Sequence, residues 1–155
     1  MPRRIFIILL FLAARLFSNT AQAQVAAPSQ GGTVSIVRVT ASTMDLEFGA
    51  SGTGQGRVVA MAPTVGGMPV PLVAADGRFY TGNAAFGQGT ALGAGHVVYS
   101  GTGHSATVTG LQPNTYYYIT NAEYNASGAS IAYNTRGTSI AMATRSAPPR
   151  PCPWS

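Results

Sequence analysis

The stretch Leu111-Gln112-Pro113-Asn114-Thr115-Tyr116-Tyr117-Tyr118-Ile119 decides the fold of this 155-residue chain. Pro113 fixes its own φ, and Asn114 tolerates left-handed backbone, so the pair predicts a tight turn. The run 115–124 that follows has no Pro or Gly and is rich in β-branched and aromatic residues. Such a run predicts a central β-strand. We therefore expect the chain to turn sharply at 113–114 and then enter a sheet.

A tyrosine two residues into such a strand can fold its hydroxyl back onto the turn that it has just left. That residue is Tyr117 here, and Leu111, Pro113 and Thr115 complete the pattern L-x-P-x-T-x-Y. The pattern resembles the tyrosine corner between strands E and F of fibronectin type III domains. It is most similar to the Gly-rich variants of secreted bacterial proteins, in which a Tyr-Asn-Gly-Ser-Gly-like turn follows; residues 124–128 read YNASG.

This resemblance covers 33–145 and implies an all-β fold, an antiparallel β-sandwich of the fibronectin type III or immunoglobulin-like kind with about seven strands. It also implies a binding or spacer module, not an enzyme, that needs no cofactor. Alternation, β-branched residues and turn clusters predict the strands independently. The expected strand segments are 33–40, 44–48, 57–62, 96–100, 105–111, 115–124 and 131–144, the last interrupted by Gly137.

The N-terminus has the order of a secretory signal peptide. A basic start (MPRR) precedes the apolar run 5–14, and Ala21-Gln22-Ala23 offers small residues for cleavage. A ten-residue apolar run is too short to span a bilayer, so we expect cleavage after residue 23 and no membrane span afterwards. The protein is then expected to be secreted or at the cell surface, with 24–32 as a flexible lead-in.

Charge excludes nucleic acid as an expected partner. The net charge of +5 includes three arginines within the first 15 residues, and the chain has no lysine. Once the signal peptide is removed, six arginines face four carboxylates, which leaves +2. That is too small a charge for a basic patch. We expect a monomer.

Two segments lie outside the minimal sandwich. The stretch 63–95 carries three prolines and eight glycines and would be a long insertion between strands C and C′. The stretch 146–155 (SAPPRPCPWS) has four prolines and cannot join a sheet. It contains Cys152, the one cysteine, so an internal disulfide is excluded. This tail is either a frayed terminus or a polyproline ligand.

Strand alternation places unexpected polar residues in the core. If Tyr117 points inward, Asn121 and Glu123 do so as well. A buried carboxylate needs a cation or several donors. We expect an ion pair between Glu123 and Arg57 on the third strand, with Arg136 as the alternative partner.

The opposite face of the same strand carries Tyr116, Tyr118 and Tyr124, and Phe79 and Tyr80 in the insertion could extend it. Exposed tyrosines can stack on sugars or anchor a protein partner; alternatively they cover neighbouring strands. The sequence thus leaves two candidate functions, a protein-interaction or adhesion module and a polysaccharide-binding module. A third possibility is a fragment of a larger secreted protein.

Catalytic groups are sparse. Asp45 and Glu47 share one strand face about 7 Å apart, which is the spacing of two residues along a strand. His96 and His104 flank turns, and no nucleophile motif or metal-ligand spacing accompanies them. We interpret all four as solvated surface residues and predict no catalytic, metal or cofactor site.

Overall fold

The structure is a computed structural model, and it describes residues 24–49, 52–69, 72–137 and 139–145. The expected signal peptide (1–23), the tail 146–155 and Cys152 therefore lie outside the described residues. The described part contains nine β-strands. They are β1 (Val34–Val39), β2 (Met44–Phe48), β3 (Gly56–Pro63), β4 (Ala91–Leu92), β5 (Gly95–Gly101), β6 (Ser105–Val108), β7 (Tyr116–Ser127), β8 (Ser130–Asn134) and β9 (Ser139–Ala143).

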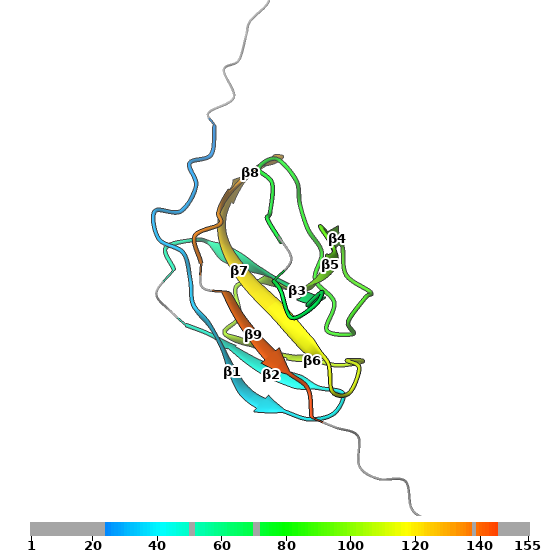
Figure 1. Ribbon diagram of the computed structural model, residues 1–155. Coiled ribbons are helices and arrows are strands. Elements are labelled where there is room, and N and C mark those ends of the chain that lie inside the picture. Colours follow the sequence, from blue (N-terminus) through cyan, green and yellow to red (C-terminus); the bar gives the residue numbers. More distant parts are fainter. Residues whose placement is uncertain (1–23, 50–51, 70–71, 138, 146–155) are drawn as a thin grey trace, which may run out of the picture.

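The strands form two antiparallel sheets (Figure 1). The smaller sheet has the order β1-β2-β6, and the larger has the order β4-β5-β3-β7-β8, with β9 also pairing with β7. The all-β antiparallel sandwich predicted from the sequence is confirmed. The count rises from about seven strands to nine because β4 is an additional short strand and the last strand is divided into two.

The last expected strand is divided near Gly137. β8 pairs with the end of β7 and β9 with its beginning, and Asn121 and Ala122, between those two stretches of β7, pair with neither. A Cβ on Gly137 would collide with the backbone carbonyl of Asn121. The interruption is therefore a break into two strands rather than a bulge within one strand.

The main hydrophobic core lies between the two sheets. The smaller sheet contributes Met44, Leu46 and Phe48, and the larger sheet contributes Met61 and Ile119 among others. This core follows the alternation that was read from β2, whose apolar residues are buried while Glu47 is exposed. Burial of such side chains contributes about 1.5–3 kcal/mol each, which makes the core the main source of stability.

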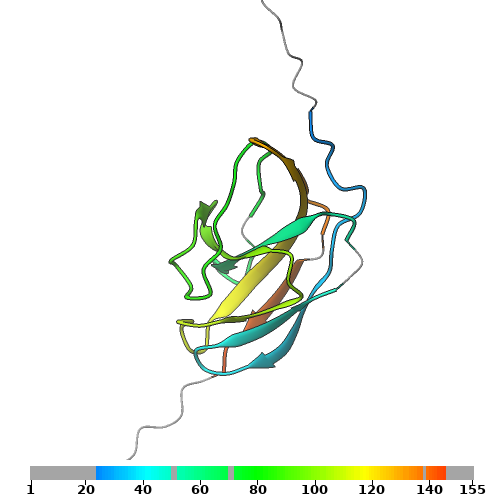
Figure 2. The same cartoon turned by 180° about the vertical axis from the view of Figure 1, so that it is seen from behind.

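A second hydrophobic cluster lies on the outer face of the larger sheet. Leu72, Ala74 and Tyr80 of the insertion pack there against Ala60 of β3 and Tyr133 of β8, with further neighbours on β3, β5 and β7. Seen from the front and from behind, the insertion lies beside the larger sheet, away from β1 and β2 (Figures 1 and 2). The larger sheet is consequently a middle layer, and β3 is buried on both faces.

Residues 24–32, expected to be a flexible lead-in, are held against the end of the larger sheet. The Asn125 side chain donates to the Ala26 carbonyl at 3.0 Å, and the Asn134 side chain donates to the Pro28 carbonyl at 2.8 Å. Pro28 itself is buried. Two asparagine amides on β7 and β8 thus satisfy backbone carbonyls that would otherwise need water. The flexibility expected of 24–32 stays a prediction.

Candidate functional site

The corner at 111–117 is closed by the tyrosine hydroxyl. The Tyr117 hydroxyl accepts a hydrogen bond from the Gln112 backbone N–H at 3.0 Å, and the ring is almost completely buried. Leu111 is buried beside it in the core, and Thr115 donates through its hydroxyl to the Pro113 carbonyl. These contacts fix the point at which β7 enters the sheet.

Sequence reasoning missed Thr144 in this corner. Its buried hydroxyl donates to the Gln112 carbonyl at 2.6 Å and accepts from the Thr115 backbone N–H at 2.9 Å. It therefore fastens the end of β9 to the turn that precedes β7. No local sequence pattern around Thr144 predicts this role, because its partners lie about thirty residues away in the sequence.

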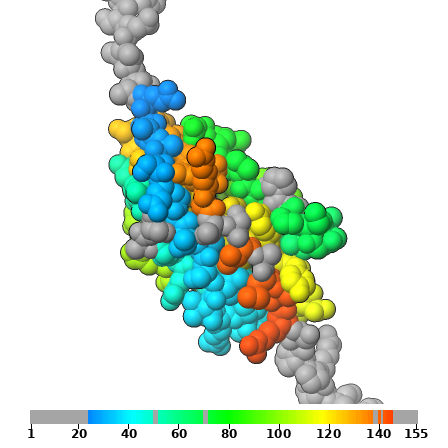
Figure 3. All heavy atoms as spheres, turned by 60° about the vertical axis from the view of Figure 1, so that its left-hand side comes forward, coloured from blue at the N-terminus to red at the C-terminus, as the bar shows by residue number. Residues whose placement is uncertain are grey.

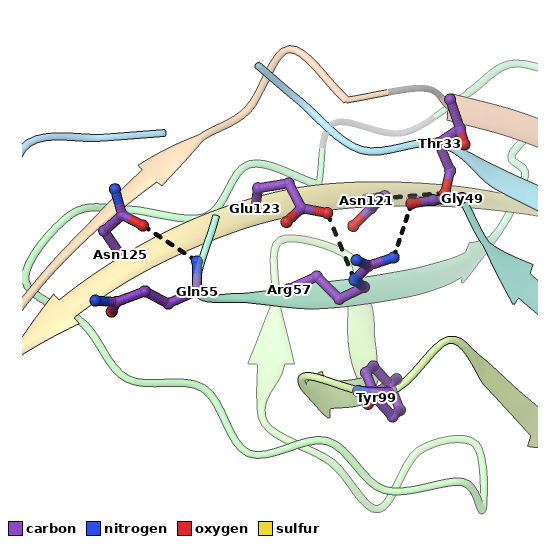
Figure 4. A network of polar contacts seen from close by, with 9 residues as sticks. Thr33, Gly49, Gln55, Arg57, Tyr99, Asn121, Glu123 and Asn125 are labelled. Carbon is purple, nitrogen blue, oxygen red and sulfur yellow. Dashed lines mark hydrogen bonds and ion pairs between the residues drawn. The ribbon is translucent and has the colours of Figure 1, made fainter. Parts of the chain in front are cut away.

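Glu123 and Arg57 face each other across β7 and β3 inside the sandwich (Figure 4). The Arg57 Nε lies 3.5 Å from the Glu123 Oε1, and the side chains are 8% and 0% exposed. Arg57 also donates from Nη1 to the Gly49 carbonyl at 3.2 Å and lies over the Phe48 ring. Arg136, the alternative partner, is exposed.

Three glycines pack directly against the carboxylate of this polar cluster. A Cβ added to Gly32, Gly52 or Gly54 would collide with the Glu123 side chain. Two segments far apart in sequence thus approach the carboxylate through bare backbone. The chain gains a tight cover over Glu123, and no space remains there for a ligand.

The Glu123 carboxylate lacks well-formed hydrogen bonds to the described residues. Neither oxygen of Glu123 makes a hydrogen bond of good geometry to the described residues, and the same holds for Asn121 Oδ1. Burial raises the pKa of Glu123 above its usual value, although the Arg57 charge, the Asn121 side chain and the Gly54 backbone all lower it. Asn121 and Gly54 act here through proximity rather than through a well-formed bond. The cluster resembles a structural ion pair and not a catalytic one, because substrate cannot reach it.

The predicted aromatic binding face is largely covered, and this expectation is corrected. Tyr116 is 60% exposed, but Tyr118 and Tyr124 are half-buried against the second cluster and Tyr80 is only 8% exposed. Phe79 is exposed on the outside of the insertion. The strand alternation of β7 does direct these tyrosines outward, but the insertion folds over that face instead of bordering it.

Tyr133 is the residue on which the insertion docks. Its ring packs edge-on against Tyr80 and Tyr124, at centroid distances of 5.8 and 5.9 Å. Its hydroxyl donates to the Arg78 carbonyl and its backbone N–H donates to the Asp76 carboxylate. Burial and the neighbouring groups raise the pKa of the Tyr133 hydroxyl. Sequence reasoning missed this role.

The polar candidates stay on surfaces. Asp45 accepts a hydrogen bond from the Thr107 hydroxyl at 2.7 Å, whereas Glu47 and His104 line a shallow polar hollow at one end of the smaller sheet. His96 is half-buried, and its Nδ1 lies 3.2 Å from the Gly89 carbonyl. Among the described residues, no group of three or more His, Cys, Asp or Glu could hold a metal ion. The described residues also contain no helix long and apolar enough to cross a membrane.

The two sheets, their strand order and the corner define an antiparallel β-sandwich with immunoglobulin-like connections. More specifically, the chain has a fibronectin type III-like fold, in which β1, β2 and β6 occupy the places of strands A, B and E. β3, β5 and β7 occupy those of C, C′ and F, and β8 with β9 that of G.

Comparison with known proteins gave matches among solved structures. The chain is similar to the solution structure of the fibronectin type-III domain of human fibronectin type III domain containing protein 3. The two are 14% identical, with a TM-score of 0.48, over 81% of this chain and 94% of that one. The fourth FNIII domain of a human protein is also 14% identical, with a TM-score of 0.46, over 88% and 98% of the respective chains. No protein-family model and no curated protein matches the sequence.

Proposed function

We propose that this chain is an exported, non-catalytic module that acts in protein interaction at the cell surface or outside the cell. A fibronectin type III-like fold is commonly a binding or spacer module, but fold alone does not assign a function. The signal-peptide order of residues 1–23 supports export. The observation that carries the choice of a protein partner is the closure of the outer sheet face by the insertion.

That closure argues against polysaccharide as the ligand. Stacking on sugars needs aromatic faces that are exposed close together. Tyr116 and Phe79 are both exposed. Tyr116 is the first residue of β7, whereas Phe79 follows Arg78, whose carbonyl accepts a hydrogen bond from the Tyr133 hydroxyl. Tyr133 pairs with Tyr124, near the other end of β7. Eight residues of strand separate the two positions along β7, roughly 25 Å at the usual rise per residue. They cannot share one sugar platform of ordinary size.

A spacer role is the second candidate, and a different observation favours it. The described part begins at Gln24 and ends at Arg145. Its first segment, coloured blue, and the end of the orange-red β9 lie at opposite ends of the molecule (Figure 1). A sandwich of this shape would hold whatever is attached to its two ends apart. This geometry is compatible with protein interaction through the sides of the domain.

The proposal is tested with the full-length chain expressed from its own start. Mass spectrometry of protein recovered outside the cell is expected to find Gln24 as the first residue, and an intact Met1 on exported protein would contradict cleavage. The purified product is then offered to a glycan array and, with cross-linking, to a mixture of extracellular and cell-surface proteins. We expect saturable capture of a protein and no glycan signal. A glycan signal that the Tyr116→Ala and Phe79→Ala variants both lose would instead support the polysaccharide alternative.

Fluorescence resonance energy transfer between two reporters tests the spacer role. One fluorescent reporter is placed at Gln24 and the other after Arg145, with a control in which the second reporter is inserted at Ala129. Gln24 and Ala129 line the same shallow hollow, so the control pair is close. Transfer is expected to be strong in the control and weak between the two ends. Equal transfer would refute the extended geometry that the spacer role requires.

A further inference from the structure

Cleavage after Ala23, which the proposed function includes, makes Gln24 the first residue of the mature protein. That cleavage gives Gln24 an α-amino group, which it lacks inside the longer chain. A glutamine in this position carries a nucleophile and an electrophile in one residue, because its side-chain amide can reach its own amine. The new terminus is therefore chemically reactive, and its surroundings in the fold decide whether the reaction is hindered.

Nothing in the described structure holds the Gln24 side chain. Gln24 is exposed. It borders a shallow hollow that is also lined by Val25, Asp76, Gly77 and residues 129–132. In the described part of the chain, no hydrogen bond restrains its amide. The amide oxygen of Gln55, by contrast, accepts from the Ala126 N–H at 2.8 Å. The Gln24 amide can therefore rotate toward its own amine without breaking a contact of the fold.

The chain is attached to the fold from the third mature residue onward. The Asn125 side chain donates to the Ala26 carbonyl at 3.0 Å. The Thr53 N–H donates to the Gln30 carbonyl at 3.3 Å, and the Thr53 hydroxyl accepts from the Gln30 N–H at 3.0 Å. In the space-filling view this blue segment lies on the surface beside the orange stretch that follows β8 (Figure 3). Only two residues precede the first of these contacts, so a reaction at the terminus leaves them in place.

We propose that Gln24 is a modification site, at which the α-amine of the mature protein closes onto the residue's own side-chain amide to form a pyroglutamyl cap. The amine nitrogen attacks the side-chain carbonyl carbon Cδ, the bond between Cδ and Nε2 breaks, and one amine proton leaves with that nitrogen as ammonia. The product is a neutral five-membered lactam, and the step needs no oxidant, reductant or metal. Part of the attacking amine is uncharged at neutral pH, because α-amino groups have pKa values of about 7.7–8.0. This inference rests on the export and cleavage in the proposed function.

The cap protects the segment 24–32. A lactam has no primary amine, so an aminopeptidase, which requires that group, cannot begin to remove residues. Removal of a few residues would delete the carbonyls of Ala26 and Pro28, which accept hydrogen bonds from Asn125 and Asn134. An exported chain meets peptidases outside the cell. A blocked terminus therefore preserves the contacts that hold this segment against β7 and β8.

The test uses the full-length chain expressed from its own start and recovered outside the cell. A synthetic peptide of residues 24–32, distinguished by heavy carbon, is added at recovery and reports any ring closure that occurs during handling. Mass spectrometry is expected to find a first peptide that starts at residue 24 and is lighter by one ammonia. Fragmentation should place that loss on the first residue, and stepwise N-terminal degradation should be blocked. The added peptide should stay largely uncyclised.

Matched variants test the protection. Gln24→Asn shortens the side chain by one carbon, so its amide would have to close a strained four-membered ring and stays open. Gln30→Asn makes the same change away from the terminus and should leave the cap in place. On incubation with an aminopeptidase of broad specificity, Gln24→Asn should lose residues from its start, whereas wild type and Gln30→Asn should keep theirs. Wild type from which a pyroglutamyl peptidase has removed the cap provides a second control and should also be shortened.

Three results would overturn the proposal. The first is exported protein that starts at Gln24 with a free amine, and the second is exported protein no more cyclised than the added peptide. The third is equal shortening of wild type and of uncapped wild type by the aminopeptidase. These results leave export and cleavage standing. An intact Met1 on exported protein would instead contradict the cleavage in the proposed function, and a first residue other than 24 would refute the cap together with the cleavage site.

Discussion

Removing the positive partner of the buried ion pair should destabilise the fold severely. In Arg57→Met the Glu123 carboxylate would remain at 0% exposure without its cation, and neither of its oxygens has a well-formed hydrogen bond to the described residues. Breaking a buried pair in this way costs about 3–5 kcal/mol. A domain of this size has a total stability of about 5–15 kcal/mol, so a large part of it would be lost.

Replacing the acidic partner of the pair should cost less stability than replacing the basic one. Glu123→Gln preserves the shape of the side chain and leaves Arg57 with its bond to the Gly49 carbonyl and its position over the Phe48 ring. We expect a loss of about 1–3 kcal/mol. The double variant has no unpaired charge and should be more stable than the sum of the single effects by about 1–3 kcal/mol.

Guanidinium or urea unfolding at neutral pH measures all three variants. Arg136→Met provides the matched control, because Arg136 is exposed and should change stability by less than about 0.5 kcal/mol. Additive effects of Arg57→Met and Glu123→Gln within about 0.5 kcal/mol would refute the ion-pair reasoning. If Arg57→Met does not fold, the pH dependence of Glu123→Gln gives an independent test.

That pH dependence has a definite sign. Burial raises the pKa of Glu123 in the folded protein above the usual value of 4.5. The folded state therefore holds this proton at a pH where the unfolded chain has lost it. The resulting stabilisation is fully present below about pH 4.5 and disappears as the pH rises through the folded pKa. Wild type should thus gain stability relative to Glu123→Gln on acidification, and a relative loss would contradict the raised pKa.

Two further predictions separate residues that are neighbours in sequence. Tyr117→Phe removes the hydroxyl that closes the corner and should cost about 0.5–1.5 kcal/mol of stability in a denaturant titration, whereas Tyr116→Phe should be almost neutral. A larger cost for Tyr116→Phe would show that the inward and outward faces of β7 are assigned the wrong way round. Tyr80→Ala empties part of the second cluster and should lower the free energy of unfolding by about 3 kcal/mol, whereas Phe79→Ala should lower it by less than about 0.5 kcal/mol. Equal shifts in the thermal midpoints of the two variants would show that the insertion does not pack as described.

The sandwich could be predicted from the sequence because its signals are local. Turn residues 113–114 begin β7, and the alternation of β2 shows which of its residues are buried. A single assignment, Tyr117 pointing inward, is sufficient to place Glu123 on the inner face by alternation. The choice of Arg57 as a partner needed only the adjacency of the third strand.

The closure of the outer face could not be predicted by the same reasoning. The insertion 63–95 has scattered apolar residues and no period, so its packing depends on tertiary contacts that no window of sequence contains. One signal was present in β3, which reads RVVAMA without alternation. A continuous apolar run indicates a strand buried on both faces. It implied that some part of the chain had to cover the outer side.

Hydrogen exchange of residues 72–80 and β8 tests the central claim most directly, namely that the insertion is part of the folded domain and closes the outer face of the larger sheet. The Gly77 amide is bonded to the Ile131 carbonyl and the Tyr133 amide to the Asp76 carboxylate. Both amides should therefore exchange orders of magnitude more slowly than in an unstructured peptide. Exchange of both at the rate of an open loop, with β3 and β7 still protected, would contradict the account and restore the tyrosine face as a free surface.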